Sequence, residues 1–332
     1  KIYIMSKSVL VTGGSGFIGS RLIKKLVNQD YEVTAVLRKT SKRDHLPIDK
    51  IKIVEIDLTV YQDILDFFTL NSFDFVIHAA GTTKALKKED YFKYNTQTTK
   101  NLIDAIKKVS WKPQKFIFIS SQAAHGTYKK LQKPIRITDI HNPITTYGKS
   151  KLLAERYIDE HYRYPYIILE PTSVYGPGDK DFLIVMKLIS RGFEGYIGKK
   201  PQRLSFIFVE DLVDAIIECI SQPHTGEYLI SDGNEYIDED FGKAVKNALD
   251  KKTIKIRIPI LIAYIAAFFS DLIAHINGKP TAFNLEKMKE LKAKNWLCDP
   301  TPFFNNFNFR PKYNLEKGIK DTIQWYKEHY WL

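Results

Sequence analysis

The stretch SVLVTGGSGFIG, residues 8–19, decides the fold of this chain. Its first half contains the continuous apolar run Val9 to Val11, which is typical of a strand buried on both faces of a parallel sheet. Its second half is rich in glycine, and an amphipathic segment over residues 17–28 follows directly. The order predicts a buried strand, a tight turn and a helix.

Glycines in such a turn let backbone N–H groups approach a pyrophosphate at the N-terminus of the following helix. A glycine turn alone is common, but this one lies between the first buried strand and an amphipathic helix. We therefore predict that it binds a dinucleotide, in preference to a turn without a ligand. The predicted ligands are Gly13, Ser15, Gly16, Phe17, Ile18 and Gly19.

The first half of the chain alternates short apolar runs with amphipathic stretches. This alternation indicates an α/β fold with a doubly wound parallel sheet, a Rossmann fold. We expect strands over residues 8–12, 32–37, 52–57, 73–79, 115–121 and 166–171, and helices over 17–28, 62–69, 89–109 and 145–161.

The pattern loosens after residue 176, where glycine and proline interrupt the chain and later segments are mostly helical. We expect a dinucleotide-binding domain over residues 6–176 and a smaller, mostly helical substrate lobe over 177–332, interleaved with the last strands of the sheet. Pro259 opens an apolar helix that Asn277 and Gly278 close. We interpret this helix as core, and residues 1–5 as a loose leader.

The composition is that of a folded protein: 332 residues, 44% hydrophobic and 27% charged. The net charge of +12 comes from scattered lysines, so we expect a solvated surface without a nucleic-acid partner. Cys219 and Cys298 are too few for a disulfide framework or a zinc site, which favours the cytoplasm and no metal. The longest apolar run, residues 258–269, is shorter than the roughly 20 residues of a membrane span. We expect neither a membrane segment nor a signal peptide.

The residue after the second expected strand predicts the choice of dinucleotide. An acidic residue there binds the ribose of NAD, whereas an arginine accommodates the 2′-phosphate of NADP. This chain has Arg38, with Ser41 and Arg43 beyond it and no carboxylate before Asp44. We predict that NADP is preferred over NAD. The alternatives are a solvated basic loop, and an Arg38 that stacks on the adenine and tolerates either cofactor.

Tyr147 and Lys151 lie one helical turn apart on one face of an expected helix. An ammonium beside a phenol favours the phenolate and lowers the pKa of the tyrosine, which suits proton exchange. Context selects this pair, because the preceding strand ends in Ser120 and Ser121, and a serine there can bond a substrate oxygen. The same spacing recurs without that context at Tyr3 and Lys7, Tyr196 and Lys200, and Tyr313 and Lys317.

These motifs together resemble the extended short-chain dehydrogenase/reductases, which include nucleotide-sugar epimerases and dehydratases, dihydroflavonol reductases and 3β-hydroxysteroid dehydrogenases. The resemblance covers nearly the whole chain in order and spacing. It rests on Thr12-Gly13-x-x-Gly16-x-x-Gly19, Asp57-Leu58, His78-Ala79-Ala80-Gly81, Ser120-Ser121, Tyr147-Gly148-Lys149-Ser150-Lys151 and residues 171–178, PTSVYGPG.

The resemblance implies a role for each matching residue and a homodimer built on the helices over 89–109 and 145–161. Tyr147 is the implied general acid/base, Lys151 its pKa partner and ribose ligand, and Ser121 the hydrogen-bonding third member. The implied cofactor ligands are Asp57 and Leu58 at the adenine, Ala79, Ala80 and Gly81 along the cofactor, and Pro171, Thr172, Ser173 and Val174 near the nicotinamide. Asn95 and Arg203 are weaker matches to substrate residues. Asp57 as a turn cap and Asn95 as a backbone ligand are the alternatives.

The chain also departs from the family pattern. Gln122 and Ala123 replace the Asp-Glu pair of the 4,6-dehydratases, which disfavours dehydration. His125 replaces a usual tyrosine, and Glu170 replaces a usual arginine. Arg203 lies one place from an arginine that holds nucleotide phosphates in sugar epimerases.

We therefore expect an enzyme that transfers hydride between nicotinamide C4 and a secondary alcohol or ketone carbon. A nucleotide-diphosphate sugar is narrowly favoured as the substrate, and a hydrophobic ketone of the dihydroflavonol or steroid kind is the alternative. A non-catalytic dinucleotide-binding scaffold would have lost Tyr147 or Lys151, and both are present.

Overall fold

A seven-stranded parallel sheet forms the centre of the computed structural model, which describes residues 6–127 and 133–332. The expected leader, residues 1–5, lies outside the described residues. The strand order is β11-β6-β5-β4-β1-β2-β3, and each neighbouring pair is parallel. The strands are β1 (Ser8–Thr12), β2 (Glu32–Leu37), β3 (Lys52–Glu55), β4 (Phe75–His78), β5 (Lys115–Ile119), β6 (Tyr166–Pro171) and β11 (Gly226–Ile230).

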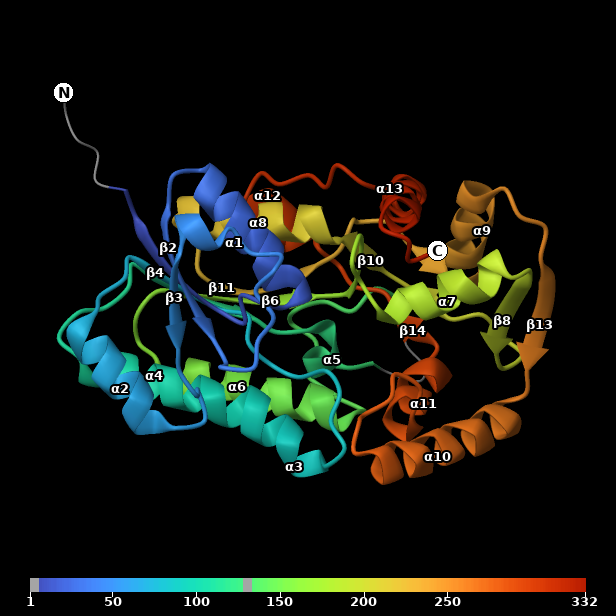
Figure 1. The fold of residues 1–332 in the computed structure, drawn as a ribbon, viewed down its shortest axis with the longest axis horizontal. Coiled ribbons are helices and arrows are strands. Elements are labelled where there is room, and N and C mark those ends of the chain that lie inside the picture. Colours follow the sequence, from blue (N-terminus) through green and yellow to red (C-terminus); the bar gives the residue numbers. More distant parts are fainter. Residues whose placement is uncertain (1–5, 128–132) are drawn as a thin grey trace.

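Helices cover both faces of this sheet, which confirms the doubly wound α/β fold (Figure 1). One face packs against α1 (Phe17–Asn28), α8 (Val209–Ser221) and α12 (Thr301–Asn306). The other packs against α2 (Tyr61–Leu70), α4 (Thr98–Lys108) and α6 (Thr146–His161). Both faces of β1, β4 and β5 are buried, as their apolar runs predict.

The helix expected over residues 89–109 is in fact three segments. They are α3 (Lys88–Tyr91), a π-helical turn over Phe92–Gln97 and α4. The widened turn contains the buried Asn95, whose side-chain amide bonds groups outside the helix. π-Helical turns are frequent at functional sites, and hydrophobic periodicity does not reveal them.

The sheet takes β11, and its covering helix α8, from beyond residue 176. A boundary at residue 176 therefore divides the sequence but not the core. A separate apolar cluster lies in the lobe on α7 (Asp181–Ser190), α9 (Asp238–Leu249) and α13 (Leu315–Glu328). The remaining elements are η1 (Ile48–Lys50), α5 (Gln122–His125), β7 (Ser173–Tyr175), β8 (Phe193–Ile197), β9 (Arg203–Leu204), β10 (Phe206–Phe208), β12 (Tyr236–Ile237), β13 (Ile254–Ile258), α10 (Ile260–Asn277), α11 (Leu285–Lys292) and β14 (Asn295–Trp296).

The apolar helix α10 begins after Pro259 and ends at a left-handed Gly278, as its sequence signals predict. The interpretation of this helix as core is wrong. Only Ala263, Ala267 and Ala274 of its residues are buried. The helix is also longer than the apolar run suggests: its 18 residues are, by length and composition alone, enough to cross a membrane.

Candidate active site

The glycine turn after β1 lies directly against the turn after β4. Gly13 has a φ of +72°, and a Cβ atom at this position would lie 2.6 Å from the Ala79 oxygen and the Ala80 nitrogen. Only glycine therefore fits, and the close approach puts the loop 13–19 beside residues 79–81, both predicted to bind the cofactor. Helix α1 begins after Gly16 with no acidic residue in its first turn, so its N-terminus suits a pyrophosphate.

A buried chain of hydrogen bonds fixes this contact. Thr12 Oγ1 lies 2.6 Å from His78 Nδ1, and His78 Nε2 lies 3.0 Å from Thr99 Oγ1. The Ala80 N–H also donates to Thr12 Oγ1 at 3.2 Å. Burial lowers the pKa of His78 to about 3, so the imidazole is neutral. The ring therefore positions β1, β4 and α4 relative to one another without adding charge.

Ser121, Tyr147 and Lys151 come together where β5 and α6 meet, as predicted. The Ser121 hydroxyl lies close enough to the Tyr147 phenol to lower its pKa. Thr145 caps α6 by accepting from the Gly148 N–H, which places Tyr147 in the first helical turn. One turn later, Lys151 Nζ donates to the Ile119 carbonyl at 2.7 Å. The trio thus joins the end of β5 to the start of α6.

The pKa of Tyr147 is raised, whereas the neighbouring Lys151 led us to expect a lowered pKa. Burial raises the pKa of Tyr147 to about 12, and the Ser121 hydrogen bond offsets only part of this shift. Burial also lowers the pKa of Lys151 to about 8, with Glu155 opposing that change. The phenol is therefore neutral at pH 7 and able to donate a proton, while Lys151 remains mostly cationic.

Arg38 is exposed after β2, at the expected edge of the sheet. Its backbone N–H donates to Ser41 Oγ at 3.2 Å, and its guanidinium contributes to a lowered pKa of Asp57, which mainly reflects hydrogen bonds from Thr59. Asp57 accepts two hydrogen bonds from Thr59, so it caps a turn, as the alternative interpretation held.

Two neighbours of Arg38 have contacts that the sequence did not predict. Arg43 pairs with Glu55, so that guanidinium already has a carboxylate partner. His45 Nε2 lies 3.1 Å from the Ser15 carbonyl of the glycine loop. The loop after β2 therefore folds back onto the phosphate turn.

The remaining predicted cofactor ligands, residues 171–174 and Leu58, have hydrogen-bond partners within the chain. The backbone N–H of Thr172 is bonded to Ile230, and its hydroxyl to Ser205. Thr172 is thus held between the end of β6 and β11, while Ser173 and Val174 belong to β7, which pairs with β10. The place of these residues near the nicotinamide stays a prediction. The Leu58 carbonyl accepts from Asn101 at 3.0 Å.

The two weaker substrate matches have partners within the chain. Asn95 is fully buried, and its amide bonds both the N–H and the carbonyl of Thr82 and the Ser150 hydroxyl. These contacts hold the loop after Gly81 against α6, whereas the alternative had Asn95 bond backbone in a helix. Arg203 forms an ion pair with Glu235 at 2.6 Å.

Two of the departures from the family pattern, His125 and Glu170, meet in a mostly buried cluster with His141 and Glu155. His125 Nδ1 lies 3.6 Å from Glu170 Oε2, and His141 Nε2 lies 3.9 Å from Glu155 Oε2 and 4.0 Å from Glu170 Oε1. Glu155 also accepts a hydrogen bond from Ser120. The sequence showed His125 and Glu170 as departures but gave no sign that these four side chains meet.

The cluster is poor in hydrogen bonds. Among the described residues, neither ring nitrogen of His125 and neither carboxylate oxygen of Glu170 has a partner of good geometry. Burial raises the pKa of both Glu170 and Glu155, and burial lowers the pKa of His125 and brings that of His141 to about 4. These shifts favour neutral carboxyl groups beside neutral imidazoles. The expectation of no metal considered only the cysteines, whereas His125, His141 and Glu170 offer ligand atoms within 4.8 Å of one another.

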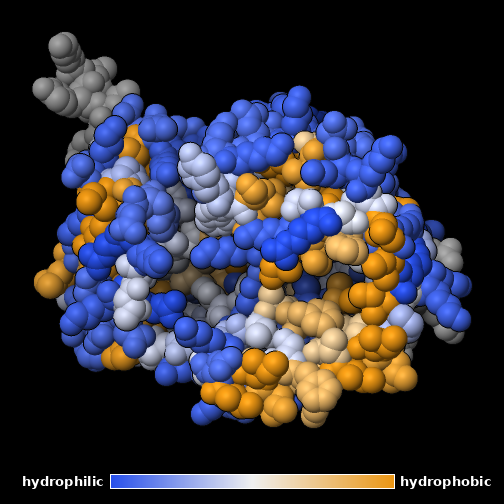
Figure 2. Space-filling model, turned by 45° about the vertical axis from the view of Figure 1, so that its right-hand side comes forward, coloured by the Kyte–Doolittle hydropathy of each residue, from blue (hydrophilic) through white to orange (hydrophobic). Residues whose placement is uncertain are grey.

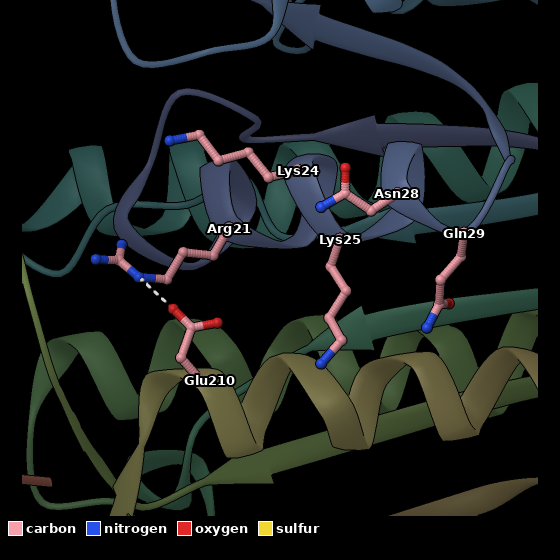
Figure 3. A pocket seen from close by; sticks show the side chains of 6 residues that line it. All are labelled: Arg21, Lys24, Lys25, Asn28, Gln29 and Glu210. Atoms are coloured by element: carbon pink, nitrogen blue, oxygen red, sulfur yellow. Dashed lines mark ion pairs between the residues drawn. The ribbon is translucent and has the colours of Figure 1, made fainter.

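A hollow between α1 and α8 lies apart from these residues (Figure 3). It is lined by Arg21, Lys24, Lys25, Asn28, Gln29 and Glu210, none of which is a predicted site residue. Arg21 pairs with Glu210 at 3.1 Å and also donates to the carbonyls of Phe17 and Pro177. Arg21 therefore ties the glycine-loop helix to the segment after β7.

Sequence comparison places these features in a family, because the profile of the "NAD dependent epimerase/dehydratase family" matches residues 9–231. The chain belongs to that family. It is 28% identical over 337 residues to UDP-glucose 4-epimerase of Vibrio cholerae, covering 96% of this chain and 95% of that protein. It is 24% identical to ceramide reductase of Caulobacter vibrioides, covering 98% and 96%.

Structure comparison confirms the fold. UDP-glucose 4-epimerase of Thermotoga maritima, solved with UDP-glucose, superposes with a TM-score of 0.79. Its sequence is 22% identical, and the match covers 97% of this chain and 99% of that one. The family match and the full-length similarity to an epimerase identify the chain as an enzyme of the extended short-chain dehydrogenase/reductase superfamily, as its motifs predict.

The buried carboxyl of Glu170 generates a stability prediction. Its folded-state pKa lies above the unfolded value, so the free-energy cost of ionising it in the fold grows as pH rises above the unfolded pKa. Glu170→Gln cannot ionise and should raise the thermal midpoint by about 2 °C or more at pH 8, which is roughly 1 kcal/mol for a chain of this size. The gain should be smaller at pH 5. Differential scanning calorimetry at both pH values measures it.

The matched control is Glu160→Gln, which removes an exposed carboxylate from the end of α6 and should leave the midpoint unchanged. A midpoint that falls in Glu170→Gln would contradict the neutral-carboxyl account. So would a stoichiometric divalent cation in the purified protein, because its ligands must be deprotonated.

Proposed function

We propose that this enzyme transfers hydride between a nicotinamide dinucleotide and the carbon of a secondary alcohol or ketone. The proposal rests on the placement of Ser121 beside Tyr147, with Lys151 one turn away and the glycine loop on the same sheet edge. The bound nicotinamide supplies or accepts the hydride. The glycine loop, Ala79 to Gly81 and residues 171–174 would hold the dinucleotide.

The side chains of the trio divide the proton work. In reduction, the neutral Tyr147 phenol donates its proton to the oxygen of the substrate while Ser121 orients that oxygen. The charge on Lys151 favours the resulting phenolate, because an ammonium lowers the pKa of a nearby phenol. In the reverse direction the same phenolate takes the proton back from the alcohol.

A nucleotide-diphosphate sugar is the first candidate substrate. The support is that UDP-glucose 4-epimerase of Vibrio cholerae matches over nearly the full length of both chains. A 4,6-dehydration remains disfavoured, because Gln122 and Ala123 occupy the positions of its acid and base, and Gln122 donates to the carbonyls of Trp296 and Leu297.

A hydrophobic ketone is the second candidate, and one observation favours it. The exposed apolar helix α10 packs on α11, and Glu286 of α11 accepts a hydrogen bond from the Thr146 N–H beside Tyr147. The similarity to a ceramide reductase supports the same candidate.

We also propose that the enzyme works in the cytoplasm, whichever of the two substrates it uses.

Replacing the phenol tests the mechanism. Tyr147→Phe should reduce turnover about 10²–10⁴-fold, because it removes the group that transfers the proton. The assay follows NADPH and NADH consumption, and epimer formation, with a panel of nucleotide sugars and hydrophobic ketones. Tyr157→Phe on the same helix, whose hydroxyl bonds Asp104, is the control and should retain turnover. Near-normal rates in Tyr147→Phe would refute the assignment.

We also propose that NADP is preferred, because Arg38 follows β2 and is exposed there. A charge-assisted bond to a phosphate contributes about 1.5–3 kcal/mol, or roughly ten- to a hundredfold in affinity. NADPH should therefore bind at least about tenfold tighter than NADH, and Arg38→Ala should remove most of the difference. Titration by fluorescence decides this. The neighbouring Lys39→Ala should keep the preference, and equal affinities in the wild type would mean that Arg38 is misassigned.

A homodimer is the third part of the proposal, with α4 and α6 as the shared surface. Leu153 of α6 is 44% exposed, as a contact between two copies would require. Light scattering at micromolar concentration should give twice the chain mass of 38.5 kDa. Leu153→Asp should give the single mass, whereas Leu70→Asp on α2 should not. A wild-type mass of 38.5 kDa would exclude the dimer.

A further inference from the structure

Helix α10 has its small residues inside and its large apolar residues outside. Ala263 and Ala267 pack against Met288 of α11. The outward side chains are each about half-exposed or more: Leu261, Ile262, Ile265, Phe268, Phe269, Leu272, Ile273 and Ile276. This arrangement is the reverse of an ordinary surface helix, which buries its large apolar residues.

These side chains form one continuous patch. Figure 2 shows apolar side chains gathered at the lower edge of the molecule, where α10 lies in Figure 1, with hydrophilic residues around them. Contiguous apolar surface of this kind marks a protein or membrane contact. Ile254 and Ile256 of β13, which leads into α10, extend the exposed apolar surface.

Contacts along α10 favour a helix that lies on a membrane over one that crosses it. Asp271 Oδ2 accepts from the Leu285 N–H at 3.0 Å, and Ser270 donates to Thr281 at 3.0 Å. A crossing helix would have to break both bonds and expose Met288. A helix parallel to the surface keeps them and buries only its outward face among lipid headgroups and upper acyl chains.

The charge of the surrounding segment favours an anionic bilayer over a second copy of the chain. Residues 251–294 contain nine lysines and arginines against three aspartates and glutamates. Two copies joined through α10 would bring two basic segments together. Anionic lipids attract such a segment instead, and basic residues beside an apolar helix face are typical of interfacial helices.

The same helix is one element away from the catalytic trio. Helix α11 packs on α10, and its Glu286 Oε2 accepts from the Thr146 N–H at 2.7 Å. Glu290 of α11 also contributes to the raised pKa of Tyr147. A bilayer under α10 would therefore lie close to the site where the substrate reacts.

We propose that this enzyme binds an anionic bilayer through the outward face of α10 and takes its substrate, a secondary alcohol or ketone of an amphiphile, from that bilayer. Binding of the bilayer is independent of the proposed function, whereas uptake of the substrate from the bilayer rests on it. A lipid-linked sugar and a hydrophobic ketone share the required chemistry, since each has an apolar anchor in the membrane.

Flotation with vesicles tests the binding. The wild-type chain should float with vesicles of phosphatidylcholine mixed with phosphatidylglycerol, and less with phosphatidylcholine alone. The double variant Ile265→Glu, Leu272→Glu should lower the partition coefficient at least about tenfold, which corresponds to ~1.4 kcal/mol. The matched control Leu70→Glu, Ile140→Glu changes two other exposed apolar residues and should float like the wild type.

Titration with the cofactor shows whether each variant is folded. Vesicle binding can therefore be compared between variants without an assay of turnover. Wild-type protein that stays unbound on both vesicle types, with cofactor affinity intact, would overturn the inference and leave the proposed hydride transfer untouched. Equal flotation of the double variant would overturn it as well. So would a doubled mass that disappears in the double variant without vesicle binding, because α10 would then join two copies.

A substrate comparison tests the second half. Amphiphilic ketones and lipid-linked sugars incorporated in vesicles should be turned over faster by the wild type than by the double variant, and the two classes are assayed separately. Water-soluble nucleotide sugars as the only substrates would overturn the bilayer source while supporting the hydride transfer.

Discussion

The parallel pairing of β4 with β1 and β5 is the constraint on which the rest of this structure depends. Parallel strands end at one edge of a sheet, so segments far apart in the sequence meet there. Thr12, His78 and Thr99 fix that edge through a buried chain of hydrogen bonds. The glycine loop and residues 79–81 are in contact because these strands share one register.

The sequence predicted this edge well because its signals are local. Continuous apolar runs located the strands, and the bounds expected for β1, β2, β6 and α1 are those observed. The trio was predictable because one helical turn separates Tyr147 from Lys151, and strand β5 leads to Ser121. Each of these inferences used spacing within a short stretch of chain.

The features that the sequence did not predict depend on long-range contacts. His125, Glu155 and Glu170 belong to three elements, and only the packing of α5, α6 and β6 brings them together. The raised pKa of Tyr147 likewise follows from burial, which residue spacing does not report. The exposure of α10 was missed because an apolar helix has the same composition in a core and on a membrane-facing surface.

The lobe and the sheet contribute differently to the proposed activity. The sheet edge holds the groups proposed to bind the dinucleotide and to move the proton, and its motifs resemble the family pattern apart from departures such as His125 and Glu170. The lobe contributes α11, which bonds the first turn of α6, and α10, whose apolar face is directed outward. We therefore assign the proposed chemistry to the sheet edge and the choice of substrate to the lobe.

Transfer of an isotopic label tests the central claim most directly. The chain is incubated with reduced nicotinamide dinucleotide that carries deuterium at both C4 positions and with each ketone of the panel, and the products are analysed by mass spectrometry and NMR. The account predicts a product with a single deuterium on its carbinol carbon and a hydroxyl proton from solvent. A reduced product without deuterium at that carbon would contradict it.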